Sequence, residues 1–281
     1  MLEIGKFNQL EIVKKVPFGL YLNSEETGEI LLPGKYVPEK FEIGQLLDVF
    51  IYLDSEDRLI ATTLKPKAVV GDFAVLKIVS NSKFGAFADW GLEKDLFIPF
   101  KEQRQKTIPG NYYLTYVYLD EQSGRIAGST KYYKFLEKDA TIFQLGQEVD
   151  ILIYERTDIG FHAIIENKMN GLVYRNEIYN KNIKPGYKTK AFIKHIRDDG
   201  KIDLSLQQHG FKTVIEFTDT VLEKLKEHNG FLGLNDKSSP ELIYETFGVS
   251  KKVYKKAIGT LYKQRKIKIE KGGIELCKPK K

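Results

Sequence analysis

The sequence has few of the residues that build disulfides and metal centres. Among 281 residues there is one cysteine, Cys277, and there are four histidines. A single cysteine cannot form a disulfide within the chain, and without a histidine near it in sequence Cys277 is not expected to act as a nucleophile. The histidines His162, His195, His209 and His228 are scattered and lack the spacing of metal ligands. We therefore expect no metal site and no cofactor.

Long apolar runs and phosphate-binding loops are also absent. The apolar runs are only a few residues long, too short for a membrane-spanning helix, and residues 1–6 lack the composition of a signal peptide. No glycine-rich phosphate-binding loop occurs. The acidic residues Asp198, Asp199 and Asp203 fit a charged turn better than the metal site of a nuclease. These absences predict a cytoplasmic, non-enzymatic protein with neither a membrane partner nor a small-molecule substrate.

Positive charge is concentrated near the end of the chain. Residues 211–281 contain 16 lysines and arginines against 9 acidic residues, whereas residues 1–210 contain 28 against 29. A local excess of basic residues indicates a polyanionic partner such as nucleic acid. The alternative is a lysine-rich surface that only contacts solvent.

A short glycine motif recurs three times. Residues 18–21 (FGLY) return as residues 84–87 (FGAF) and, degraded, as residues 159–162 (IGFH). Each copy lies in a stretch of roughly 60 residues, the size of a small β-barrel. Each copy is followed by a strand that ends in a charged turn, at residues 49–54, 115–120 and 192–197. A basic residue that begins a short strand comes next, at residues 58–60, 125–127 and 201–203. Three modules in one order predict a tandem array.

The modules predict three five-stranded OB-type barrels, over residues 1–66, 67–139 and 140–210. Residues 211–281 have helical periodicity instead, with the apolar residues Phe211, Ile215, Leu222 and Leu225, and Thr218 between them, at helical spacing. Ser239 before Pro240, and Ser250, are helix starts. The last two predicted strands flank a glycine turn at residues 272–273. Three helices followed by a hairpin indicate a winged helix, an α+β domain after the all-β barrels.

Aromatic residues alternate with aliphatic ones in the fourth strand of the first module. Period two places Phe50 and Tyr52 on the outside of the barrel, and Tyr116 and Tyr118 have the equivalent positions in the second module. Exposed rings are a stacking surface for the bases of single-stranded RNA. The alternative is that these rings pack between neighbouring barrels.

The pattern Phe-Gly-x-Phe, a third strand, then Asp and a following Arg resembles the S1-type RNA-binding domain. The resemblance implies that two aromatic residues, an aspartate and an arginine of each module face RNA. In the third module His162 replaces the second ring and Arg197 the aspartate. The predicted RNA-binding residues are Phe18, Tyr21, Phe50, Tyr52, Asp54, Arg58, Phe84, Phe87, Tyr116, Tyr118, Asp120, Arg125, Phe161, His162, Tyr174, Lys194, Arg197 and Lys201.

The order of three S1-like domains and a winged helix resembles the bacterial CvfB family, also called the YitL-type S1 RNA-binding proteins. That resemblance implies a tandem RNA-binding protein in post-transcriptional control of gene expression, including that of virulence factors. Single-stranded RNA is the expected partner. Two alternatives are a transcriptional regulator that binds duplex DNA, and a scaffold that docks on the ribosome or on a nuclease.

The second helix of the predicted helix-turn-helix is strongly cationic. Val253, Ala257, Ile258 and Leu261 form its expected buried stripe, and the basic residues lie largely off it. Only Gln264 offers a side chain for bidentate base recognition, so weak sequence specificity is expected. The predicted nucleic-acid contacts of this domain are Lys251, Lys252, Lys255, Lys256, Lys263, Arg265, Lys268 and Lys271.

Overall fold

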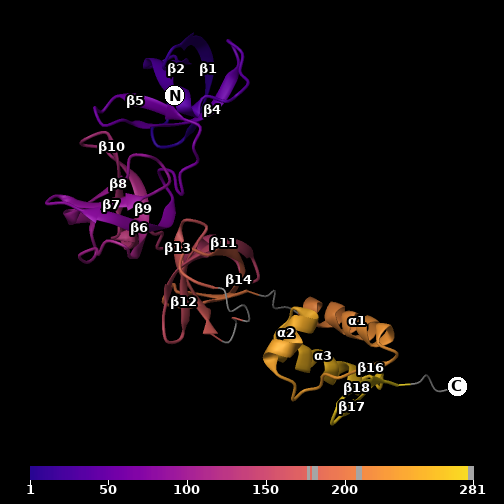
Figure 1. Cartoon of the computed structure of the whole chain (residues 1–281). Coiled ribbons are helices and arrows are strands. Elements are labelled where there is room, and N and C mark those ends of the chain that lie inside the picture. The colour runs from indigo at the N-terminus through magenta and orange to yellow at the C-terminus, as the bar shows by residue number, and fades with distance from the viewer. Residues whose placement is uncertain (176–177, 179–182, 207–210, 278–281) are drawn as a thin grey trace. The chain divides into compact units, whose positions relative to one another are not determined.

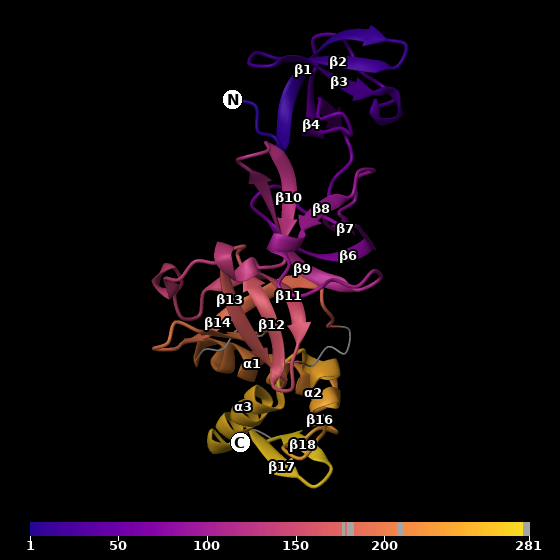
Figure 2. The same ribbon diagram turned by 90° about the vertical axis from the view of Figure 1, so that its left-hand side faces the viewer.

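The computed structural model describes residues 1–175, 178, 183–206 and 211–277, except for the side chains of residues 211–216. Contacts divide the chain into two compact units, Met1–Leu136 and Glu137–Lys281 (Figure 1, Figure 2). His209, the side chains at 211 and 215, and part of the predicted boundary between residues 210 and 211 lie outside the described residues. The division into four domains remains a prediction.

The first unit begins with a closed five-stranded barrel, here barrel 1. Its strands pair in the order β1-β2-β3-β5-β4, and only β3 and β5 are parallel. Alternate residues fill the interior, where Ile12, Leu22 and Ile51 are completely buried. A bulge between Ile12 and Lys14 bends β1. The strands are β1 (Phe7–Val16), β2 (Gly19–Ser24), β3 (Gly28–Pro33), β4 (Leu46–Leu53) and β5 (Leu59–Thr62).

The second set of five strands, barrel 2, repeats the circular order of barrel 1. Its ladder runs β10-β9-β6-β7-β8, so β8 and β10 form the two edges. These edges nevertheless lie next to each other. Gly128 of β10 is so close to β8 that a Cβ on it would be 3.0 Å from the side chains of Leu96 and Ile98. The elements are β6 (Phe73–Asn81), β7 (Gly85–Asp89), β8 (Leu96–Pro99), β9 (Tyr112–Asp120), β10 (Arg125–Ser129) and the short helix η3 (Tyr132–Phe135).

The second unit contains another closed barrel, barrel 3, with the strand order β11-β12-β13-β15-β14. The order matches that of barrel 1, as the sequence repeat predicts. Ile153, Ala163 and Leu204 are completely buried in its core. The strands are β11 (Glu148–Arg156), β12 (Gly160–Ile165), β13 (Met169–Tyr174), β14 (Lys188–Ile196) and β15 (Ile202–Ser205).

The chain ends in three helices and a three-stranded sheet, which form a winged helix. Ser239 and Ser250 cap α2 and α3 by accepting hydrogen bonds from backbone N–H groups, as predicted. Gly248, at φ 68°, ends α2. The elements are α1 (Phe211–Glu227), β16 (Phe231–Leu232), α2 (Pro240–Phe247), α3 (Lys251–Lys263), β17 (Ile267–Glu270) and β18 (Gly273–Leu276). The predicted fold class, tandem five-stranded barrels followed by a winged helix, is confirmed.

The glycine of the repeated motif has a packing role in every barrel. A Cβ at Gly19, Gly85 or Gly160 would lie 2.1, 2.3 or 2.0 Å from a carbonyl oxygen of the facing strand. Only glycine permits this approach of two strands. In barrels 1 and 2 the glycine thus fixes the place on the barrel where the aromatic pairs Phe18 and Tyr21, and Phe84 and Phe87, lie.

No helix in the described part of the chain combines the length and the apolar composition that crossing a bilayer requires.

Candidate nucleic-acid interface

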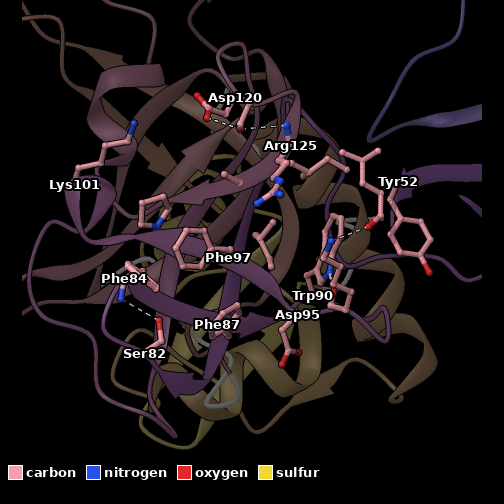
Figure 3. A pocket seen from close by; sticks show the side chains of 17 residues that line it. Tyr52, Ser82, Phe84, Phe87, Trp90, Asp95, Phe97, Lys101, Asp120 and Arg125 are labelled. Atoms are coloured by element: carbon pink, nitrogen blue, oxygen red, sulfur yellow. Dashed lines mark hydrogen bonds between the residues drawn. The ribbon is translucent and has the colours of Figure 1, made fainter. Parts of the chain in front are cut away.

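A groove with a volume of about 700 Å³ lies on the outside of barrel 2 (Figure 3). Strands β7, β8 and β10 and the loops beside them form most of it, and the end of β4 in barrel 1 contributes Tyr52 and Leu53. We call it the barrel 2 groove. The residues in it that can contact a nucleic acid are Ser82, Phe84, Phe87, Lys94, Asp95, Phe97, Lys101, Asp120, Ser123 and Arg125. The four residues that the S1 resemblance selects in this module, Phe84, Phe87, Asp120 and Arg125, are therefore brought together.

Three phenylalanine rings line the barrel 2 groove. Phe87 and Phe97 face each other from β7 and β8, with ring centroids 5.3 Å apart and planes tilted by 44°. Phe84 is 66% exposed, and Lys83 Nζ lies 5.0 Å from the centroid of its ring. These rings offer surfaces on which bases can stack.

Phe97 is absent from the sequence-based prediction. Its neighbours Leu96 and Ile98 are buried in the barrel core, so strict alternation points Phe97 outward. That alternation is the signal that identifies this residue.

Charged groups of both signs also line the groove, with Asp120 and Arg125 on one side and Asp95 on the opposite side (Figure 3). Asp120 Oδ2 accepts a hydrogen bond of 2.7 Å from Ser123 Oγ, and the Arg125 guanidinium donates to Asp57 of barrel 1. Burial, with a smaller contribution from Asp89, raises the pKa of Asp95. The groove therefore joins an apolar aromatic part to a polar part, the combination that recognises a base together with its phosphate.

Barrel 1 has the same motif, but its aspartate and arginine have different partners from those in barrel 2. Phe18 is 57% exposed and contacts Tyr21 edge to face, with centroids 6.3 Å apart. Asp54 and Arg58 form an ion pair of 2.8 Å with each other. Burial alone would raise the pKa of Asp54, but hydrogen bonds from the backbone and side chain of Arg58 lower it. In barrel 1 the predicted aspartate and arginine thus satisfy each other, whereas in barrel 2 they have separate partners.

The prediction that Phe50 and Tyr52 form an exposed stacking surface is wrong. The two rings lie outside barrel 1, as period two requires, yet they are 0% and 6% exposed. They pack into the core cluster of barrel 2, where the Trp90 ring meets Phe50 at 5.7 Å. Burial raises the pKa of Tyr52 to about 12. The alternative stated above, packing between neighbouring barrels, describes these residues.

Tyr116 and Tyr118 are covered as well, by the segment that follows barrel 2. The ring of Phe135 in η3 stacks on Tyr116 with a centroid distance of 4.0 Å, and on Tyr118 at 5.8 Å. Phe73 contacts the Tyr116 ring at 4.7 Å. Both tyrosines are half-buried, and burial raises the pKa of Tyr118 to about 12. The prediction of an open aromatic face on β9 is therefore wrong.

In barrel 3 the prediction for Phe161 is wrong, because β12 alternates and sends this ring into the core. His162 points outward and stacks on Tyr154 at 6.0 Å. Arg197, in the place of the aspartate, donates to Tyr174 and pairs with Asp203 at 2.7 Å. The two remaining predicted residues of this barrel, Lys194 and Lys201, are exposed, and Lys201 pairs with Asp199 at 2.7 Å.

The winged helix presents a cationic surface on α3 and the hairpin. Ala257, Ile258 and Leu261 are buried as predicted, Val253 is half-buried, and the fully buried ring of Tyr254 was not predicted. Tyr262 is 57% exposed among the lysines and was also missed. Of the predicted contacts, Lys251 is half-buried, and the exposed ones are Lys252, Lys255, Lys256, Lys263, Arg265, Lys268 and Lys271.

Comparisons with known proteins identify both kinds of domain. Residues 4–64 match the S1 domain family, and residues 219–276 match the CvfB-like winged helix domain family. Conserved virulence factor B of Staphylococcus aureus strains USA300 and NCTC 8325 is 27% identical over 249 residues, which cover 85% of this chain and 82% of the relative. The protein of strain RF122 is 26% identical over the same length.

A solved structure also aligns along the chain. It is a multidomain protein with nucleic acid binding domains from Streptococcus pneumoniae, 25% identical, with 98% of each chain covered and a TM-score of 0.42. Both matched domain families are of the nucleic-acid-binding type. The chain thus matches the S1 domain family in its first barrel and the CvfB-like winged helix domain family at its end, and it is similar to Conserved virulence factor B over most of its length.

Proposed function

We propose that this chain is a non-enzymatic, cytoplasmic protein that binds single-stranded RNA and regulates gene expression after transcription. The barrel 2 groove is its main stacking site, and the cationic winged helix adds affinity for the phosphate backbone. The S1 domain match and the similarity to proteins named Conserved virulence factor B support a regulatory role related to virulence.

The observation that carries this proposal is the arrangement of rings and cations in one groove. Phe84, Phe87 and Phe97 line it together with Lys94 and Arg125. Stacking of a base on such a ring contributes about 1–3 kcal/mol, and it favours unpaired bases because a duplex hides their faces. A groove of this kind selects a single strand over a duplex.

Fluorescence anisotropy of the full chain tests the proposal. The ligands are a single-stranded RNA of about 12 nucleotides and a duplex DNA of equal length, each at about 50 mM and about 200 mM salt. Tighter binding of the RNA that persists at the higher salt supports stacking in the groove. Preference for the duplex, lost at the higher salt, contradicts it.

Variants of the rings locate the site. Phe84→Ala with Phe87→Ala should weaken RNA binding by about 1–3 kcal/mol for each lost base contact. The matched control is Phe18→Ala with Tyr21→Ala, the same motif in barrel 1, where Tyr21 faces Leu31 instead of a third ring. Equal losses for the two pairs would refute a main site in barrel 2. Native circular dichroism is required of both variants.

The winged helix supports a second candidate function, the binding of duplex DNA. In a helix-turn-helix the second helix enters the major groove, and α3 is that helix here. Its exposed lysines contact phosphates and carry little sequence information. The duplex arm of the same anisotropy experiment decides between the two functions. Co-purification of ribosomal particles or a nuclease with the full chain would instead favour the scaffold.

A further inference from the structure

Two cations in the barrel 2 groove lie close to a carboxylate of barrel 1. Arg125 and Lys94 both line the groove, and Arg125 Nη2 donates to Asp57 Oδ2. The charges of Asp57 and Arg125 both act on Lys94, as does that of Asp54. Burial lowers the pKa of Lys94, Asp57 raises it and Arg125 lowers it. Asp57 thus pairs with Arg125 and, together with Asp54, acts on the charge of Lys94.

The turn between β4 and β5 holds this carboxylate in place. Asp54 Oδ1 accepts hydrogen bonds from the backbone N–H groups of Glu56 and Arg58, at 2.8 and 3.0 Å. Asp57 has a φ of 62°, in the left-handed region that aspartate and asparagine adopt more readily than other residues. The shape of the turn therefore comes from the turn itself and does not depend on the contact with Arg125.

Barrel 2 fixes the position of the same turn relative to the groove. Lys94 Nζ donates to the carbonyl oxygens of Leu53 and Asp54, at 3.1 and 2.6 Å. The strand that leads into the turn is anchored by Phe50, which packs against Trp90 in a shared core. The approach of the carboxylate to Arg125 is thus built into the packing of the two barrels.

We infer that Lys94 and Arg125 form a subsite for a backbone phosphate of single-stranded nucleic acid, which Asp57 occupies while the groove is empty. A carboxylate and a phosphate both accept charge-assisted hydrogen bonds from a guanidinium, so each can replace the other. The Arg125–Asp57 pair is 60% and 43% exposed, a weak pair that a phosphate can displace. This inference rests on the proposed function of the groove. It makes Asp57 of barrel 1 a competitor that sets the affinity of barrel 2.

Asp57→Asn in the full chain tests the inference. Asparagine keeps the shape and the left-handed backbone preference of Asp57 while it removes the charge. The matched control is Glu56→Gln, which removes the same charge from the same turn. Glu56 pairs with Arg58 at 2.8 Å and has no described contact with Arg125. The difference in RNA affinity between the two variants therefore reports the contact between Asp57 and Arg125, because both variants remove one negative charge from the same turn.

The probe is a fluorescently labelled single-stranded RNA of about 12 uridines, titrated at several salt concentrations. Asp57→Asn should tighten binding about two- to fivefold more than Glu56→Gln, the range for release of an exposed ion pair. It should also steepen the salt dependence by up to about 0.7 in log Kd per log salt, because in the wild-type chain salt also weakens the competing Arg125–Asp57 pair. The tighter binding and the steeper salt dependence should both vanish when Arg125→Gln is added to Asp57→Asn.

Equal affinities and equal salt slopes for Asp57→Asn and Glu56→Gln would overturn the subsite. A gain that persists with Arg125→Gln would overturn it too. Failure of the proposed function gives a different result, because Phe84→Ala with Phe87→Ala would then leave RNA binding unchanged. Thermal melts of both turn variants verify that the fold is intact.

Discussion

At the scale of single residues, the glycine of the repeated motif has a structural role, although it lies beside rings of the candidate binding site. Gly85 lies between two rings of the candidate site, but its backbone contact with the facing strand explains its presence. Gly85→Ala should lower the free energy of unfolding by about 1–3 kcal/mol, because the added Cβ forces two strands apart. Urea unfolding followed by the fluorescence of Trp90, the single tryptophan, measures this. Gly34→Ala, in the same unit, is the control, since the nearest atom to a Cβ there would be 3.5 Å away, an ordinary contact. Equal stability of the two variants would show that the strands can separate without cost.

Tyr52 provides a prediction about pH. Burial raises the pKa of its phenol to about 12 in the folded chain, above the ordinary value of 10.0. A group whose pKa is raised by folding stabilises the fold fully below its unfolded pKa, and this contribution is lost as the pH rises through the folded pKa. The melting temperature of the first unit should therefore fall between about pH 10 and about pH 12.

Tyr52→Phe should make that fall less steep, because phenylalanine does not titrate. Calorimetry of both proteins at about pH 8 and about pH 11 provides the comparison. Tyr118, whose pKa is also raised to about 12, continues to titrate in the variant. The pH dependence of the melting temperature should therefore become smaller without disappearing. Parallel curves for the two proteins would mean that folding does not raise the pKa of Tyr52.

At the scale of elements, strand β4 shows what the sequence predicts and what it does not. Period two correctly assigned Ile51 to the barrel interior and Phe50 and Tyr52 to the outside. It did not identify what covers the outer rings, because Trp90 comes from another barrel and no local pattern encodes that contact. The repeated motif likewise predicted the barrels and four of the residues that meet in the groove, Phe84, Phe87, Asp120 and Arg125. The groove's link to Asp57 depends on docking of the two barrels and has no sequence signal.

Helix α3 contains a glycine that packing does not require. A Cβ on Gly259 would meet no atom within 4 Å, and a glycine inside a helix is less stable than alanine by about 0.5–1 kcal/mol. Gly259→Ala should raise the stability of the winged helix by about that amount. Circular dichroism at a helical wavelength during thermal unfolding measures the change. A lower melting temperature would contradict the open space at this position.

At the scale of the whole molecule, the salt dependence of RNA binding depends on the winged helix. Lys252→Gln, Lys255→Gln and Lys263→Gln together should reduce the salt slope by about 2, at about 0.7 for each lost phosphate contact to a single strand. The control replaces three exposed lysines of the first unit, Lys40, Lys65 and Lys106, in the same way. An unchanged salt slope for the winged-helix variant would show that these three lysines do not contact the RNA.

The shared core of the first unit also affects how the chain is made. Barrel 1 can close as soon as β5 leaves the ribosome, but Phe50 and Tyr52 are covered only after Trp90 has been synthesised and barrel 2 has folded. At about 5–20 residues per second, the run Val49-Phe50-Ile51-Tyr52-Leu53 has an uncovered apolar outer face for seconds. Apolar, β-prone segments of this length associate with one another. Nascent chains stalled after β5 has left the ribosome but before β10 has left it should therefore be the species most prone to aggregate during translation.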